Sequence, residues 1–499
     1  MSETLMVTRL SVANASALHT QTPTTPAHTV AVVILEASHH LSHARLNRLL
    51  ASSLPQLARF RSRLVGKPLG MGQPVWAEID DYDPTPHIQC ASVPAPGGSR
   101  ELADLVTQLS AESHDWRRSL WKAWTIDGLA GGRWALAVKM SPVLSDEGRG
   151  VAAVWERLLT GGPHDSADTL PKEASLGPPP SLGALVTDTV SEILDNHIAG
   201  GWLVVEGVTG VLQAMRRTDG PPVDSQATSS MRGPVPQTVF NARLTKRRSM
   251  AFAAIPLAQV KTVSGAFGGS TANVFLAACT LSLRAWLQRY DVVPDDPLVM
   301  QVPMSLPAGD PAEAGKSLTA GQVRVPVQLT DPVQVLTNLH TAAERLNIAH
   351  DFDEKIDPAV DPATILSLLP PWVAHAGMRV YTGLGLARWR APSCHVSVSF
   401  ASGEPGPAYC AGAEIVGMHT AEPLVEGCGL NITVTSHADV MDLCLCACPD
   451  NVPGVNEIAT GIVEAVDILL AAAAKSPRGK GRSVVTEMTS HATKRMRGH

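Results

Sequence analysis

Hydrophobic positions along the chain follow two spacings, which predict a mixture of helices and strands. Leu102, Leu105, Val106 and Leu109 recur at the spacing of one face of an amphipathic helix. The run 134–138 is short and apolar, and it predicts a buried strand that ends shortly before Pro142, where a proline is tolerated. Helical and strand patterns alternate along the chain, so the sequence predicts an α/β or α+β architecture.

Two segments rich in glycine, proline and serine divide the chain, at 161–183 and 218–236. The segment 184–217 between them predicts a connecting helix. The last residues are polar and basic, which is typical of a solvated, disordered end. The predicted organisation is therefore an N-terminal domain over 1–160, a linker with a connecting helix over 161–236, a C-terminal domain over 237–474 and a basic disordered tail over 475–499.

Composition limits the classes of function. With 499 residues and 44% hydrophobic content, the chain is long enough to build two or three cores. A net charge of -6 gives no electrostatic footprint for nucleic acid, so nucleic-acid binding is not expected. No basic segment followed by an apolar core opens the sequence, and the apolar run 468–474 falls far short of the about 20 residues that span a bilayer. A cytoplasmic protein is expected, and its basic tail is compatible with peripheral contact with a membrane or lipid droplet.

The eight cysteines indicate reduced thiols, because nothing in the sequence indicates secretion. Cys444, Cys446 and Cys448 alternate with other residues, which predicts three thiols on one face of a strand. Same-face side chains on a flat strand lie about 6.6 Å apart, too far to converge on one ion. These cysteines are interpreted as small buried hydrophobic residues, and no metal is predicted.

Four segments together resemble the bacterial wax ester synthase/diacylglycerol acyltransferase family. They are Leu57–Leu64 with Pro74–Trp76, Phe240–Arg248 followed by Pro256–Lys261, Ser119–Leu136 before the expected active-site loop, and Pro423–Val434. Similarity spans roughly residues 30 to 470. The resemblance implies two domains of the chloramphenicol acetyltransferase type with a tunnel between them. It also implies transfer of a long acyl chain from acyl-CoA to diacylglycerol or a fatty alcohol, with acyl-CoA as co-substrate and no cofactor.

The family's active-site motif is altered in this chain. Where the family has His-His-x-x-x-Asp-Gly, the sequence reads Ser141-Pro142-Val143-Leu144-Ser145-Asp146-Glu147. The second histidine of the motif is the general base in the family, and Pro142 stands in its place without a side-chain base. Asp146 matches the motif's aspartate, which braces the loop, and Glu147 adds a carboxylate that could act as a base only if burial raised its pKa.

A substitute base and the binding residues must therefore come from elsewhere. His395 and His437 lie in predicted strands of the second domain that could line the tunnel, although each could equally be a satisfied strand residue. Gly429 and Asn431 resemble a family motif near the tunnel, where glycine permits close backbone approach and asparagine can bond a carbonyl. These two residues are binding candidates, with a purely structural role as the alternative.

Two functions follow from the resemblance. The first is an O-acyltransferase that makes triacylglycerol or wax ester, with its catalytic base unassigned. A positioned base contributes about 10² to 10⁴ in rate, so a slower enzyme that depends on proximity is compatible with the altered motif. The second is a non-catalytic relative that binds acyl-CoA, lipid or a partner protein. The sequence leaves acyl chain length, acceptor identity and oligomeric state open.

Overall fold

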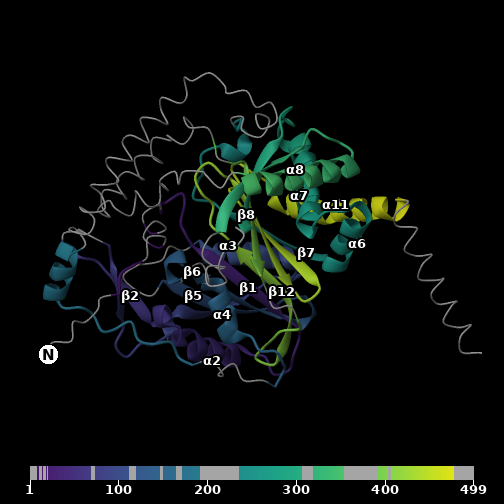
Figure 1. Ribbon diagram of the computed structural model, residues 1–499. Coiled ribbons are helices and arrows are strands. Elements are labelled where there is room, and N and C mark those ends of the chain that lie inside the picture. The colour runs from purple at the N-terminus through teal and green to yellow at the C-terminus, as the bar shows by residue number, and fades with distance from the viewer. Residues whose placement is uncertain are drawn as a thin grey trace, which may run out of the picture.

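The computed structural model (Figure 1) describes most of both predicted domains. The described residues are 8–10, 14, 18, 21–68, 73–111, 120–145, 150–164, 171–191, 235–305, 318–352, 392, 394–402 and 406–476.

The first sheet has six strands in the order β11-β12-β1-β6-β5-β4. Their bounds are β1 Thr29–Leu35, β4 Ile88–Ser92, β5 Trp121–Asp127, β6 Trp134–Met140, β11 Tyr409–Cys410 and β12 Ala413–Ala421. Between them lie the 3₁₀ segments η1 Leu54–Gln56, η2 Ala58–Arg61, η4 Thr85–His87 and η5 Ala130–Gly132, and a separate pair of strands, β2 Ser62–Val65 with β3 Val75–Glu78. Strand β6 confirms the buried strand expected over 134–138.

Helices cover both faces of this sheet. Helix α2 (His43–Ser53) begins at Ser42, whose hydroxyl accepts from the Arg45 amide, and it packs with α4 (Gly150–Leu158) on one face. Helix α3 (Ser99–Ser110) lies on the other face, where Leu102 and Val106 share a core with β1. The predicted amphipathic stripe over 102–109 is therefore confirmed. Residues 182–191 begin the predicted connecting helix, and the rest of that segment lies outside the described residues.

The second sheet also has six strands, in the order β7-β14-β13-β10-β8-β9. Their bounds are β7 Ser249–Pro256, β8 Leu298–Ser305, β9 Leu318–Val325, β10 Val396–Ser402, β13 Leu430–His437 and β14 Val440–Ala447. The 3₁₀ segment η9 (Val239–Asn241) leads into this unit, and the helices α6 Leu257–Phe267, α7 Thr271–Tyr290, α8 Pro332–Phe352 and α11 Val455–Lys475 accompany the sheet. Helices α6, α7, α8 and α11 share one core with its inner residues.

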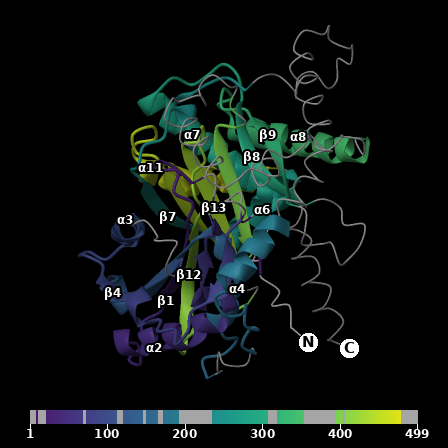
Figure 2. The same cartoon turned by 90° about the vertical axis from the view of Figure 1, so that its left-hand side faces the viewer.

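The opposite face of the second sheet meets the first unit, and we call this contact the seam. Its core joins Met250, Phe252, Cys444 and Cys446 of the second sheet to residues such as Val30 of the first. Strand β12 holds the seam closed, because it follows β10 in the chain yet pairs with β1 of the other sheet. In Figures 1 and 2 this yellow-green strand runs among the purple and blue strands of the first unit. The mixed α/β fold with two sheet-and-helix units agrees with the predicted fold class.

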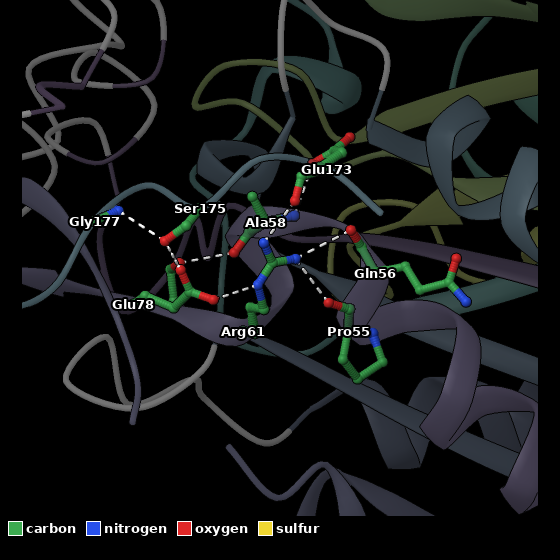
Figure 3. Close-up of polar contacts among 9 residues, drawn as sticks. Pro55, Gln56, Ala58, Arg61, Glu78, Glu173, Ser175 and Gly177 are labelled. Carbon is green, nitrogen blue, oxygen red and sulfur yellow. Dashed lines mark hydrogen bonds and ion pairs between the residues drawn. The ribbon is translucent and has the colours of Figure 1, made fainter. Parts of the chain in front are cut away.

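A buried arginine attaches the chain after α4 to the first unit (Figure 3). The Arg61 guanidinium donates to the Glu78 carboxylate at 2.5 Å and to the carbonyl oxygens of Pro55, Gln56 and Glu173. The Glu173 carboxylate in turn accepts from the Ala58 amide at 2.7 Å. The segment around Glu173, which belongs to the predicted linker, is therefore bound against the first unit.

We expect Arg61→Met to lower the free energy of unfolding by about 3 to 5 kcal/mol, because it removes the guanidinium from the Glu78 carboxylate, which keeps the Ser175 hydroxyl, and from three carbonyl groups. The control is Arg133→Met, which removes a pair with Glu36 whose side chains are 48% and 42% exposed. This second change should cost less than about 1 kcal/mol. Urea unfolding followed by circular dichroism measures both, and equal losses would contradict a special role for Arg61.

Candidate active site

The position of the altered motif lies at the end of strand β6. The Ser141 amide continues the strand ladder by donating to the Leu120 carbonyl at 2.9 Å, and the 3₁₀ segment η6 (Pro142–Leu144) follows. Ser141 is buried, and its hydroxyl has no hydrogen-bond partner among the residues that the structure describes. Neither Ser141 nor Pro142 offers a group that could take up a proton near neutral pH.

The loop is nevertheless held in a fixed shape. The Arg59 guanidinium donates to the Ser145 carbonyl at 2.7 Å. The side-chain amide of Asn14 donates to the Val143 and Ser145 carbonyls. The Ser145 hydroxyl accepts from the Gly150 amide at 2.8 Å, at the start of α4. Asp146 and Glu147 lie outside the described residues, so the bracing role expected for Asp146 stays a prediction.

His395 uses both of its ring nitrogens to hold the backbone. The Val299 amide donates to Nδ1 at 2.8 Å, and the Pro236 carbonyl lies 2.8 Å from Nε2, which fixes the proton on Nε2. The side chain is fully buried, and this burial lowers the pKa of His395. The neutral imidazole of His395 thus joins β8 and the start of β10 to the chain at Pro236. These contacts favour the alternative of a satisfied structural residue.

His437 lies at the other end of the seam from the altered motif. Its Nδ1 lies 2.8 Å from the carboxylate of Asp442, which also accepts the Met418 amide of β12 at 2.7 Å. Met418 pairs with Val33, which pairs with Leu136, five residues before Ser141. Five residues of strand span about 17 Å, so the ring of His437 is remote from position 142. A role of His395 or His437 as substitute base stays a prediction. The contacts of both rings favour a structural role.

Gly429 and Asn431 lie at the same end of the seam as the altered motif. The Gly429 amide donates to the Phe240 carbonyl at 2.7 Å, and a Cβ atom at Gly429 would lie 3.0 Å from that oxygen, so a larger residue would push the two backbones apart by a few tenths of an ångström. Asn431 is buried, pairs with Cys446 and accepts from the Thr433 hydroxyl at 2.9 Å. Thr433, Thr435 and His437 continue the same polar stripe along β13.

Sequence reasoning missed a largely buried carboxylate directly after β12. Glu422 follows β12 and accepts from the Thr29 hydroxyl at 3.1 Å. Burial raises the pKa of Glu422, and the Thr29 hydrogen bond opposes that rise. The residue still keeps part of its surface accessible. The sequence carries one weak signal, a single glutamate among apolar residues in Ala421-Glu422-Pro423-Leu424.

Positive charge gathers on the neighbouring part of the seam. Burial, together with the charges of Lys139 and Arg248, lowers the pKa of His28 to about 3. The Lys139 ammonium is buried and donates to the Ser110 carbonyl at 2.8 Å, while the Arg248 guanidinium donates to the carbonyls of Thr245, Arg247 and Thr24. His28 is therefore a neutral imidazole near pH 7, and its low basicity makes it a weak proton acceptor.

The three cysteines of the predicted alternation line the seam. Cys444, Cys446 and Cys448 are buried and free. Burial raises the pKa of Cys444 well above its usual range and that of Cys446 to about 11, and Glu422 adds to both shifts. Such thiols stay protonated and are poor nucleophiles. Within the described ranges, no group of three histidine, cysteine or acidic side chains could hold a metal ion.

A hollow of about 580 Å³ lies elsewhere, between α8 and the end of β9. Arg324, Pro326, Val333 and Thr337 are among the residues that line it. None of its lining residues belongs to the loop at Ser141 or to the seam core. The chemistry of the seam, not the size of this hollow, therefore identifies the candidate site.

No single helix among the described residues is long and apolar enough to cross a membrane. Helices α6 and α7 satisfy the length and composition criteria only as a pair, and the chain bends by 100° between them. Many residues of α7 are buried in the core of the second unit.

Comparison with known proteins points to one family. Residues 10–275 match the wax ester synthase/diacylglycerol acyltransferase catalytic domain, and residues 315–469 match the C-terminal domain of the same family. A Mycobacterium tuberculosis H37Rv protein named as a candidate diacylglycerol O-acyltransferase is 27% identical, over 94% of this chain and 92% of its own length. A second such protein of that strain is 30% identical, over 77% of this chain and 81% of its own.

A solved structure agrees with the fold. The wax ester synthase/diacylglycerol acyltransferase from Marinobacter aquaeolei VT8 superimposes with a TM-score of 0.67. The match covers 93% of this chain and 100% of the other at 21% sequence identity. The likeness therefore shows the shared fold of the two chains.

Histidines with lowered pKa make the folded protein sensitive to acid. Burial lowers the pKa of His28, His395 and His419 below the ordinary value of 6.5. The unfolded chain therefore takes up protons first as the pH falls, and the free energy of unfolding should decrease from about pH 6.5 downward. For His28 this window extends to about pH 3.

We expect His28→Gln to reduce the loss of stability between pH 7 and pH 5.5, because it removes one imidazole that takes up a proton when the chain unfolds. His39→Gln, at an exposed turn position, is the control and should leave the loss unchanged. Urea unfolding at the two pH values measures the difference. Identical pH dependence in the His28 variant and the natural protein would contradict a buried, neutral His28.

Proposed function

Because the chain belongs to the wax ester synthase/diacylglycerol acyltransferase family, we propose that it transfers a long-chain acyl group from acyl-CoA to a lipid hydroxyl. The acceptor would be diacylglycerol or a fatty alcohol, and the product triacylglycerol or a wax ester. The observation that carries the proposal is the match of both family domains along one chain, which includes the loop after β6.

The reaction asks three things of the protein. The acceptor hydroxyl must lie against the thioester carbonyl, its proton must leave as the new ester bond forms, and the CoA thiolate must depart. We infer that these events occur at the end of the seam that holds the loop after β6. Asn431 and the backbone beside Gly429 are proposed to contact the substrates there.

The second candidate function is binding without turnover. The observation that favours it is Pro142 at the place where the family supplies a histidine pair, beside a Ser141 hydroxyl that finds no partner in the described part of the chain. A relative of this kind would keep the seam and bind acyl-CoA, lipid or a partner protein.

The expected setting is the cytoplasm, with peripheral contact with a membrane or lipid droplet. Such contact would give the protein access to its water-insoluble acceptor. The basic residues of the predicted tail 475–499 are proposed to favour an anionic surface, each by about 1 kcal/mol. Lys475 ends α11, and residues 477–499 lie outside the described residues.

We expect the purified natural protein to release free CoA thiol from long-chain acyl-CoA and to form ester only when diacylglycerol or a fatty alcohol is present. Thin-layer chromatography of radiolabelled product measures the transfer. The comparison is the double variant Ser141→His/Pro142→His, which restores the family's histidine pair. Turnover in the natural protein supports the enzyme, whereas turnover in the variant alone would contradict it and support the binding function.

A further inference from the structure

We propose that a row of polar side chains across the second sheet, together with the hollow between α8 and β9, binds the CoA part of acyl-CoA. The row holds the pantetheine arm, and Arg324 in the hollow holds a phosphate of the nucleotide. The inference rests on the proposed use of acyl-CoA as donor and adds the residues of this chain that recognise it.

The row is set by the register of four neighbouring strands. Asn431 of β13 pairs with Ser397 of β10, and Ser397 also pairs with Gln301 of β8. Gln301 in turn pairs with Gln322 of β9. Paired residues in neighbouring strands point to the same face of a sheet. Hydroxyl and carboxamide groups therefore lie side by side across the sheet.

The row lies on the face of the sheet that is turned away from its helices. The residues on either side of Ser397 and Gln301 belong to the core that the sheet shares with those helices; they are Val396, Val398, Met300 and Val302. Side chains alternate between the two faces of a strand, so Ser397 and Gln301 point to the seam face, which also carries Asn431.

The row becomes more accessible toward the edge of the sheet. Asn431 is buried, whereas Ser397 and Gln301 are half-buried. Gln322, on the last strand of the described sheet, is exposed. The row therefore offers a path of polar contacts from the edge of the sheet inward to Asn431, which is already a candidate for substrate binding.

The hollow lies where the row reaches the edge. Arg324 follows Gln322 by two residues on β9 and lines this hollow of about 580 Å³. Among the described residues that line it, Arg324 is the one that carries a charge, and Gln328, Gln334 and Asn338 add carboxamide groups. A guanidinium among neutral hydrogen-bonding groups suits a phosphate, which arginine binds through two parallel hydrogen bonds.

The charges around the hollow leave its lining positive. The Arg284 guanidinium of α7 donates to the Val327 carbonyl at 2.6 Å, in the connector between β9 and α8. Asp295 and Asp296 precede β8, and Asp331 precedes α8. These three carboxylates are exposed and do not belong to the lining. Water and salt screen exposed charges, so the acidic side chains oppose an anion in the hollow only weakly.

The separation between the two parts fits the ligand. Three strand-to-strand spacings separate Asn431 from Gln322, which makes about 14 Å. The pantetheine arm is roughly as long as four to five extended residues, about 15 Å. Its amide groups donate and accept hydrogen bonds, as do the side chains of the row. A thioester at Asn431 therefore leaves the nucleotide at the edge of the sheet, beside Arg324.

The test measures the binding of S-octyl-CoA to the full-length protein by isothermal titration calorimetry, beside S-octyl-pantetheine, which has the same arm without the nucleotide. Neither thioether can be cleaved, so binding is measured without turnover. S-octyl-CoA should bind about tenfold more tightly, because it adds the contact between Arg324 and phosphate. Its Kd should rise with salt, whereas the Kd of the neutral S-octyl-pantetheine should stay constant. Equal affinities for the two ligands would overturn the inference.

Arg324→Gln should weaken the binding of S-octyl-CoA about tenfold, remove most of its salt dependence and leave the Kd of S-octyl-pantetheine within about twofold. The unchanged S-octyl-pantetheine affinity also shows that the variant is folded. The control is Arg289→Gln, at an exposed pair with Glu457 in the same unit, and it should leave both affinities unchanged. An Arg324→Gln protein that binds S-octyl-CoA as tightly as the natural one would overturn the site in the hollow.

Ser397→Ala and Gln301→Leu test the row. Each should weaken both ligands by the same factor, about three- to tenfold, because each removes a hydrogen bond to the shared arm. Both side chains are half-buried, and an unfolding temperature equal to that of the natural protein confirms that each variant is folded. Unchanged affinity in both variants, or a loss limited to S-octyl-CoA, would overturn the row as the site of the arm.

The acyl transfer assay separates this inference from the proposed function. Arg324→Gln should raise KM for acyl-CoA and leave kcat nearly unchanged, because the contact is made equally before and during the reaction. Transfer with an unaltered KM overturns the inference while the function stands. Binding as described without transfer supports the inference and overturns the acyl transfer. A natural protein that binds neither ligand overturns both.

Discussion

The pairing of β12 with β1 is the constraint on which the rest of the structure depends. Strands β10 and β13, which come before and after the pair β11 and β12 in the chain, belong to the second sheet. The ladder of β12 with β1, from Val30–Ala421 to Leu35–Ile415, belongs to the first. This pairing presses the face of the second sheet that α6, α7, α8 and α11 leave uncovered against the first unit, where α3 packs on it, and forms the shared core of the seam. It also fixes Asp442 against the Met418 amide and Glu422 against the Thr29 hydroxyl. A single strand thus joins the units and places the polar groups between them.

The contacts of the loop after β6 explain how the chain can keep the shape of the active-site loop without its histidines. Arg59, Asn14 and Ser145 hold the backbone of the loop through its carbonyl groups and the amide of Gly150, and none of these bonds needs an imidazole. Proline fits at position 142 because the chain turns there into a 3₁₀ segment. The shape of the site and its proton chemistry are therefore separable. The fold supplies the shape, and a proton acceptor has to come from a residue other than Ser141 and Pro142.

Local pattern was enough to predict several parts of this fold. The stripe at Leu102–Leu109, the apolar run 134–138 and the alternating cysteines each depend on side-chain periodicity, and the structure has a helix, a strand and a buried strand face there. The crossing of β12 could not be predicted in the same way, because its residues indicate a strand without indicating its partner. Glu422 was missed for a related reason. A glutamate before a proline is typical of an exposed loop, and its basicity depends on burial by segments distant in sequence.

The most direct test of the central claim is a crystal structure of the full chain with a thioether analogue of long-chain acyl-CoA, which cannot be cleaved, and with a fatty alcohol. We predict that the sulfur lies in the seam beside Pro142. The alcohol should then lie beside the sulfur, in contact with Asn431 or with the backbone at Gly429. An analogue bound in the hollow between α8 and β9, with the seam empty, would contradict the account.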